Sequence, residues 1–130
     1  MTDADSAPDP SALKAIVDRY VEVASGRDVE AYVDLFADDA VIIDPVGTPP
    51  HVGRDAVRAF RQSAVDAVTS MDFTAHRTRA AGDHVAFNFV VDAAVGGAKM
   101  HIEGIEIFQV EAGKITHMTA IWGEADATFA

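Results

Sequence analysis

The chain has 130 residues, of which 49% are hydrophobic and 24% charged, so it can build one hydrophobic core but is too short for two ordinary domains. Its formal net charge of −11 repels phosphate backbones and anionic membrane surfaces, and we therefore expect neither nucleic acid nor a membrane as a partner. The absence of cysteine excludes disulfides, thiolate metal sites and a cysteine nucleophile.

The N-terminal segment MTDADSAPDP is acidic and lacks the apolar core of a signal peptide. We expect residues 1–10 to form a flexible tail and residues 11–130 to form a single domain. A cytoplasmic location follows by elimination.

The first helix is predicted from a regular apolar pattern. Apolar residues recur at helical spacing between Ser11, a suitable N-cap, and Gly26, a C-terminal stop signal. This pattern places Tyr20 on the buried face, where a tyrosine is either a core residue or a functional one.

Two more helices are expected before the long strands. Asp28 is a suitable cap for a short second helix, which we expect to end near the solvated acidic pair Asp38 and Asp39. A third helix is predicted over about residues 54–66, with Phe60 on its apolar face.

A short strand is predicted between the second and third helices. The segment AVIID, from Ala40 to Asp44, is rich in β-branched residues and runs into the turn-forming PVGTPP. Asp44 therefore stands at the end of a strand, before a proline that favours an extended conformation. The alternative is that Asp44 is an ordinary turn residue, because Asp-Pro opens many turns.

After the third helix the apolar period changes to two. Strands are predicted at roughly 71–80, 84–95, 98–110 and 114–123, joined by glycine-containing turns typical of hairpins. They would form an antiparallel meander. The predicted fold class is α+β, a cone in which three N-terminal helices cover one face of a curved sheet and enclose an apolar pocket.

Alternation along each strand predicts which residues face the pocket. The register that turns Ile102, Phe108 and Val110 inward also turns Glu106 inward, unless a β-bulge at Gly104 reverses it. Two further inward rows are Phe87, Phe89 and Val91 on one strand and Met118, Ala120 and Trp122 on another.

Two carboxyl groups in unlike surroundings indicate proton transfer. An apolar wall disfavours the anion of Glu106, so its pKa should rise and the protonated group could donate a hydrogen bond. Asp44, at the pocket mouth with access to water, could stay ionised and act as a base.

The sequence lacks the motifs of metal-dependent, acyl-transfer and nucleotide-dependent enzymes. The five histidines show neither an HExxH motif nor an i, i+4 pair, so no metal site is predicted. There is no GxSxG elbow, P-loop or GxGxxG motif, which leaves acyl transfer and nucleotide chemistry without support.

The run FADDAVIIDPVGTPP, followed by GRDAVRAF, resembles the bacterial ketosteroid isomerases of the NTF2-like, or SnoaL-like, superfamily. The similarity extends from about Leu13 to Gly123. It includes Tyr20 within RYVEVASGRD, Glu106 and Phe108 on the penultimate predicted strand, and AIWGE on the last one.

The resemblance implies an NTF2-like cone that works as a homodimer without a metal or organic cofactor. It implies a steroid Δ5-isomerase, in which Asp44 moves a proton to convert 3-oxo-Δ5 steroids to 3-oxo-Δ4 steroids through a dienolate. Tyr20 and Glu106 match the family's tyrosine and protonated aspartic acid, which stabilise the dienolate oxygen. The expected ligand is a steroid or similar hydrophobe, in contact with Phe60, Phe87, Phe89, Val91, Phe108, Met118, Ala120 and Trp122.

The chain also departs from that family. Glu106 is one methylene longer than the aspartic acid, and Phe36 and Arg61 stand where relatives have tyrosines that support the oxyanion tyrosine. Tyr32 is a candidate substitute for these supporting tyrosines.

Other functions of the same fold are also considered. A limonene-type epoxide hydrolase would need an arginine at Gly104, which argues against that activity. Another NTF2-like enzyme, such as a polyketide cyclase or dehydratase, and a non-catalytic steroid or hydrophobe-binding protein remain as alternatives.

Overall fold

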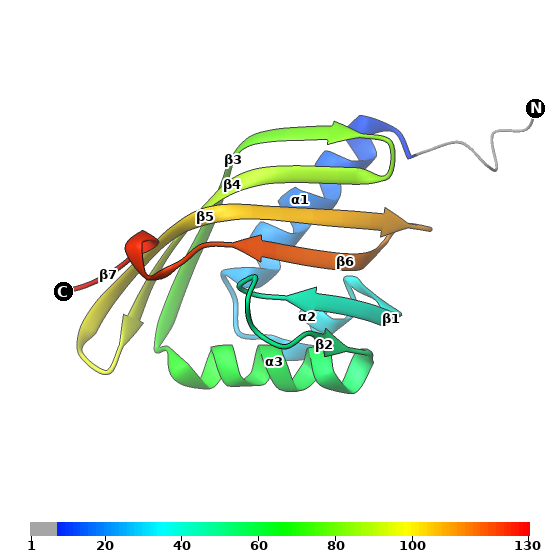
Figure 1. Cartoon of the computed structure of the whole chain (residues 1–130). Helices are drawn as coiled ribbons and strands as arrows, with labels where there is room; N and C mark the ends of the chain where they lie inside the picture. The colour runs from blue at the N-terminus through cyan, green and yellow to red at the C-terminus, as the bar shows by residue number, and fades with distance from the viewer. Residues whose placement is uncertain (1–7) are drawn as a thin grey trace, which may run out of the picture.

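The structure is a computed structural model that describes residues 8–130. Within this range the chain is α+β, with three α-helices and one curved, open sheet of seven strands (Figure 1). The helices are α1 (Pro10–Ala24), α2 (Val29–Val33) and α3 (Arg54–Ala67). The strands are β1 (Phe36–Ile43), β2 (His51–Val52), β3 (Ser70–Ala81), β4 (His84–Val95), β5 (Ala98–Glu111), β6 (Lys114–Ile121) and β7 (Ala127–Phe129).

The sheet is antiparallel over most of its width. Strands β3 to β6 form the predicted meander, and the strand order is β2-β1-β6-β5-β4-β3. Gly82 and Gly113 have positive φ angles of 59° and 76° in two of the hairpin turns, a conformation that glycine adopts at low cost. The strand predicted at Ala40–Asp44 corresponds to the second half of β1, but its parallel pairing with β6 was not predicted. Strands β2 and β7 were not predicted; β2 pairs with β1, and β7 pairs with β5.

Helix α1 begins two residues earlier than predicted, at Pro10. The side chain of Asp9, rather than that of Ser11, caps it by accepting a hydrogen bond from the Ser11 N–H at 2.7 Å. Pro10 therefore occupies the first helical turn, where a missing N–H is tolerated, and does not belong to the tail. The rest of the predicted tail up to residue 7 lies outside the described residues. None of the helices in the described part is long and apolar enough to span a bilayer.

The predicted second helix is too long. Helix α2 ends at Val33, and Phe36 already belongs to β1, where it pairs with Ile115 of β6. Asp38 and Asp39 are exposed on this strand and do not end a helix. The apolar positions in this stretch fit both a helical and an alternating pattern, and pairing with β6 selects the strand.

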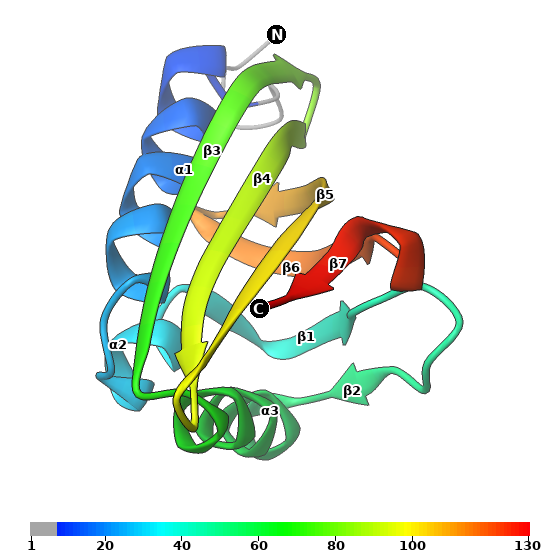
Figure 2. The same ribbon diagram turned by 90° about the vertical axis from the view of Figure 1, so that its left-hand side faces the viewer.

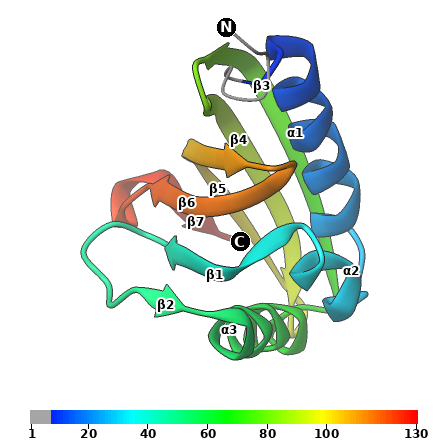
Figure 3. The ribbon, with the colours of Figure 1, turned by 90° about the vertical axis from the view of Figure 1, so that its right-hand side faces the viewer.

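The hydrophobic core lies between α1 and the inner face of the sheet. Figure 2 shows α1 beside β3, and Figure 3 shows α3 below β1. The ring of Tyr20 on α1 packs edge-on against Phe108 and Phe73, with centroid distances of 4.9 and 5.3 Å. Tyr20 therefore joins the helix to β5 and β3.

The register between β4 and β5 is uninterrupted, with Phe89 opposite Gly104 and Phe87 opposite Glu106. There is no bulge at Gly104, and Glu106 faces inward with only 2% of its surface exposed. A Cβ atom at Gly104 would lie 2.6 Å from the Ile121 carbonyl oxygen and 2.7 Å from the Phe89 ring. Glycine is needed there because the Phe89 ring and the neighbouring backbone come so close.

This close approach predicts that Gly104→Ala destabilises the protein. The added methyl group has to displace the Phe89 ring or the backbone, which typically costs about 1–3 kcal/mol of unfolding free energy. Denaturant unfolding measures the change. Gly123→Ala is the matched control, because a Cβ atom there meets nothing within 4 Å, and equal stability of the two variants would contradict the described packing.

Candidate active site

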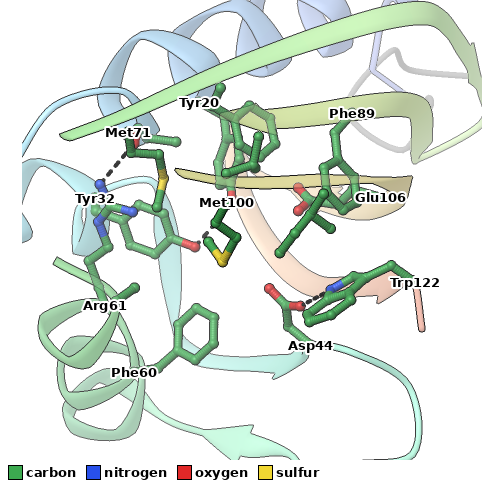
Figure 4. Close-up of a pocket in the computed structure, with 15 residues that line it drawn as sticks. Tyr20, Tyr32, Asp44, Phe60, Arg61, Met71, Phe89, Met100, Glu106 and Trp122 are labelled. Atoms are coloured by element: carbon green, nitrogen blue, oxygen red, sulfur yellow. Dashed lines mark hydrogen bonds between the residues drawn. The ribbon is translucent and has the colours of Figure 1, made fainter. Parts of the chain in front are cut away.

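A pocket opens between the helices and the inner face of the sheet (Figure 4), with a cavity volume of about 130 Å³. Its polar lining consists of Tyr20, Tyr32, Asp44, Arg61 and Glu106. The remaining lining is apolar or aromatic. The fold therefore brings together all three residues predicted to be catalytic, although they come from α1, the end of β1 and β5.

The predicted ligand contacts divide into two groups. Phe60, Phe89, Val91 and Trp122 line the pocket. The other four do not line it and lie fully buried in the core, each at most 1% exposed: Phe87, Phe108, Met118 and Ala120. Alternation correctly identifies the inner face of a strand, but it does not tell which part of that face α1 covers and which part stays open.

The predicted ligand contacts omitted six apolar residues that line the pocket: Ala24, Ala64, Met71, Phe73, Met100 and Ile102. Alternation had already turned Ile102 inward, although it was not named as a ligand contact, and Met100 shares the same register, so strand alternation could have identified Met100 as well. Met71 and Met100 are half-buried, and they place two flexible thioether side chains in the pocket wall.

Asp44 follows directly after β1 and is held by Trp122. The indole Nε1–H of Trp122 donates a hydrogen bond to Asp44 Oδ1 at 2.9 Å (Figure 4). Burial raises the pKa of Asp44 above its ordinary value, while the Trp122 hydrogen bond and the charge of His51 act in the opposite direction. Asp44 is thus an oriented carboxylate of increased basicity, which suits a general base.

Glu106 faces the same central space from β5 (Figure 4). Its Oε1 atom is fully buried and has no hydrogen-bond partner within residues 8–130. Burial, together with the negative charge of Asp44, raises the pKa of Glu106 well above its usual range, against a smaller opposing effect of Tyr20. The protonated form is favoured because an unpaired buried carboxylate is costly, and that form can donate a hydrogen bond.

Tyr20 is the second neutral donor. Burial is the main reason that its pKa lies well above the ordinary value, followed by the charge of Glu106. Its hydroxyl oxygen lies 3.2 Å from that of Tyr32, which is itself fully buried. Tyr32, the candidate substitute for the missing family tyrosines, is therefore in hydrogen-bonding contact with Tyr20.

Arg61 has an unexpected position for a charged residue. It lies buried in the pocket wall, and its Nη2 donates to the carbonyl oxygens of Ala24 and Gly26, at 3.0 and 2.8 Å, at the C-terminal end of α1. The guanidinium carbon lies 4.7 Å from the centroid of the Tyr32 ring. The helix end and the ring face both stabilise the buried cation.

The site provides one base and two neutral hydrogen-bond donors in an apolar setting. This combination suits removal of a proton next to a carbonyl group, whose oxygen gains negative charge as the proton leaves. In the part of the chain that the structure describes, no three His, Asp or Glu side chains gather closely enough to hold a metal ion.

The Trp122 hydrogen bond predicts a change in the basicity of Asp44. In Trp122→Phe the carboxylate loses a donor that stabilises its charge, so the pKa of Asp44 should rise further. Nuclear magnetic resonance titration of the Asp44 carboxyl carbon measures this. An unchanged or lower pKa in a folded Trp122→Phe protein would show that the bond does not hold Asp44 in solution.

Burial of Glu106 predicts a pH-dependent stability. Above its ordinary pKa of 4.5, the unfolded chain releases the Glu106 proton while the folded protein keeps it. The contribution of Glu106 to the unfolding free energy should therefore be complete below pH 4.5 and fall by about 1.4 kcal/mol per pH unit above it, until Glu106 ionises in the folded state.

Denaturant unfolding of wild type and Glu106→Gln across this pH range measures the contribution. The stability difference between the two should shift in favour of the variant as the pH rises. The exposed Glu111→Gln, on the same strand, serves as control. A difference independent of pH would contradict a protonated Glu106.

Comparisons with known proteins fit this geometry. The model of the SnoaL-like domain family matches residues 17–118. The steroid Δ-isomerase of Nocardioides simplex is 35% identical over 115 residues, which cover 88% of this chain and 92% of that protein.

Solved structures give two further likenesses. The epoxide hydrolase/cyclase-like enzyme SalBIII superposes with a TM-score of 0.81 at 29% identity, over 88% of this chain and 92% of its own. A computationally designed 17-OHP binder superposes with a TM-score of 0.83 at 26% identity, over 94% of this chain and the whole of the other.

Proposed function

Because the chain belongs to the SnoaL-like domain family, we propose that it is an enzyme that isomerises 3-oxo-Δ5 steroids to 3-oxo-Δ4 steroids by intramolecular proton transfer. The observation that carries the proposal is the convergence of Asp44, Tyr20 and Glu106 on one apolar pocket. The similarity to a steroid Δ-isomerase supports the reaction, and a steroid binder designed on the same fold supports the ligand class.

Asp44 is the proposed base. Its carboxylate takes the proton from the carbon between the ketone and the double bond, and returns it to the far end of the resulting dienolate. No proton is gained or lost overall, and Asp44 ends as a carboxylate again. The raised pKa strengthens the base, and the bond from Trp122 fixes the orientation of the carboxylate.

Tyr20 and Glu106 are the proposed donors to the dienolate oxygen. Tyr20 keeps its proton near neutrality even at its ordinary pKa of 10.0, and burial raises that pKa further. For Glu106, burial raises the pKa well above its ordinary value and so favours the protonated form. In a site that excludes water, loss of one such donor typically raises the barrier by about 2.7–4 kcal/mol. A second copy of the chain, docked through the exposed face of the sheet, is proposed as the partner in a homodimer.

The central test uses a 3-oxo-Δ5 steroid, whose conversion is followed by the ultraviolet absorbance of the conjugated enone. Asp44→Asn should reduce kcat by about 10²–10⁴, because it removes the base while keeping the shape of the side chain. Asp39→Asn is the matched control, since Asp39 is exposed on β1, the strand that leads to Asp44, and it should keep full activity. A wild-type protein that binds the steroid without forming the enone would refute the proposal.

Epoxide opening is the second candidate function, favoured by the structural likeness to SalBIII. A protonated Glu106 could donate its proton to an epoxide oxygen while Asp44 deprotonates the attacking hydroxyl group. An epoxide with an internal hydroxyl group distinguishes epoxide opening from steroid isomerisation. Only an epoxide-opening enzyme would consume it in a reaction that depends on Asp44.

A non-catalytic binding protein would give a third result. It would bind the steroid equally well as wild type and as Asp44→Asn, and neither protein would convert it. Calorimetric titration of both with the steroid measures this affinity.

A further inference from the structure

Tyr20 and Tyr32 are the only tyrosines in the chain, and they form one buried hydrogen-bonded pair. Each hydroxyl group carries a single proton. When Tyr20 donates its proton to a ligand, its oxygen remains free to accept the proton of Tyr32, whose other acceptor is the weakly accepting Met118 Sδ at 3.9 Å. Tyr32 is therefore placed to stabilise the negative charge that moves toward Tyr20 during the reaction.

Arg61 is the charged neighbour of Tyr32 (Figure 4). Its side chain is 4% exposed, and no carboxylate among residues 8–130 forms an ion pair with it. Three carbonyl oxygens at the end of α1 accept hydrogen bonds from Nη2 and hold the guanidinium in place. Its central carbon lies 4.7 Å from the centroid of the Tyr32 ring. The buried cation thus acts on Tyr32 more directly than on any carboxyl group in the pocket.

We propose that Arg61 is a positioning residue, which holds Tyr32 against Tyr20 and polarises the Tyr32 hydroxyl, so that Tyr20 becomes a stronger donor to the substrate oxygen. The inference rests on the proposed function for the identity of that oxygen. The contacts among the three residues do not depend on it.

The Arg61 cation acts on Tyr20 through Tyr32. A cation over an aromatic ring attracts its electrons, which makes the phenol more acidic and its hydroxyl a better donor. The charge of Arg61 accordingly lowers the pKa of Tyr32, although burial has the larger effect and raises it. Hydrogen-bonded hydroxyl groups then polarise one another, so the effect reaches Tyr20.

A purely structural role for Arg61 leads to a different expectation. Its bonds to Ala24 and Gly26 connect α3 to the end of α1, and losing them could disturb the pocket without involving Tyr32. A double-mutant cycle separates the two roles, because only the proposed role requires the Tyr32 hydroxyl.

The cycle compares kcat and KM for a 3-oxo-Δ5 steroid in wild type, Arg61→Met, Tyr32→Phe and the double variant. Arg61→Met should lower kcat by roughly tenfold with little change in KM, since the lost stabilisation is felt in the transition state. The double variant should be no slower than Tyr32→Phe alone. Arg61→Lys should recover part of the loss, because lysine keeps the charge.

Two kinetic results would overturn the inference. Additive losses in the cycle would mean that Arg61 acts through the end of α1. A rise in KM at unchanged kcat would mean that Arg61 contacts the substrate itself. Thermal unfolding checks that each variant is folded. If Arg61→Met does not fold, Arg61→Lys takes its place in the double-mutant cycle.

A measurement on the free protein separates this inference from the proposed function. The hydroxyl proton between Tyr20 and Tyr32 should give a protected, low-field proton resonance that is missing in Tyr32→Phe. In the folded Arg61 variant the resonance should move to higher field and exchange faster; an unchanged resonance would refute the role of Arg61. A shifted resonance in a protein that does not isomerise the steroid would refute the proposed function alone.

Discussion

The site depends on a carboxyl group kept where water cannot solvate it. Glu106 lies in an apolar wall with one oxygen unpartnered among the described residues, so its neutral form is the favourable one. Asp44 faces the same cavity from the end of β1, but its carboxylate accepts the indole hydrogen bond of Trp122. The difference in solvation and hydrogen bonding favours the neutral form of Glu106 and supports the carboxylate form of Asp44.

Much of this arrangement follows from local patterns in the sequence. Alternation along β5 is enough to turn Glu106 inward, because one residue of slip would expose Phe108 and Val110 to water. The apolar face of α1 likewise fixes the orientation of Tyr20. Residues that share a face with several core positions can therefore be assigned from the pattern of the sequence alone.

Contacts between distant segments could not be predicted in this way. Trp122 and Asp44 are 78 residues apart, and no local pattern relates an indole at the end of one strand to a carboxylate at the end of another. The parallel pairing of β1 with β6 brings them together, and this same pairing overrides the helical pattern up to Phe36. The contact between Tyr20 and Tyr32 likewise depends on how α1 and α2 are placed in space.

The size of the cavity has a consequence for how ligands enter. Its volume of about 130 Å³ is small beside the roughly 300–1,000 Å³ of pockets that enclose drug-sized molecules. A multi-ring ligand therefore needs a wider conformation, and Met71 and Met100 are the flexible wall residues that can provide it. The apparent affinity for such a ligand would equal the intrinsic affinity multiplied by the fraction of molecules in the open conformation.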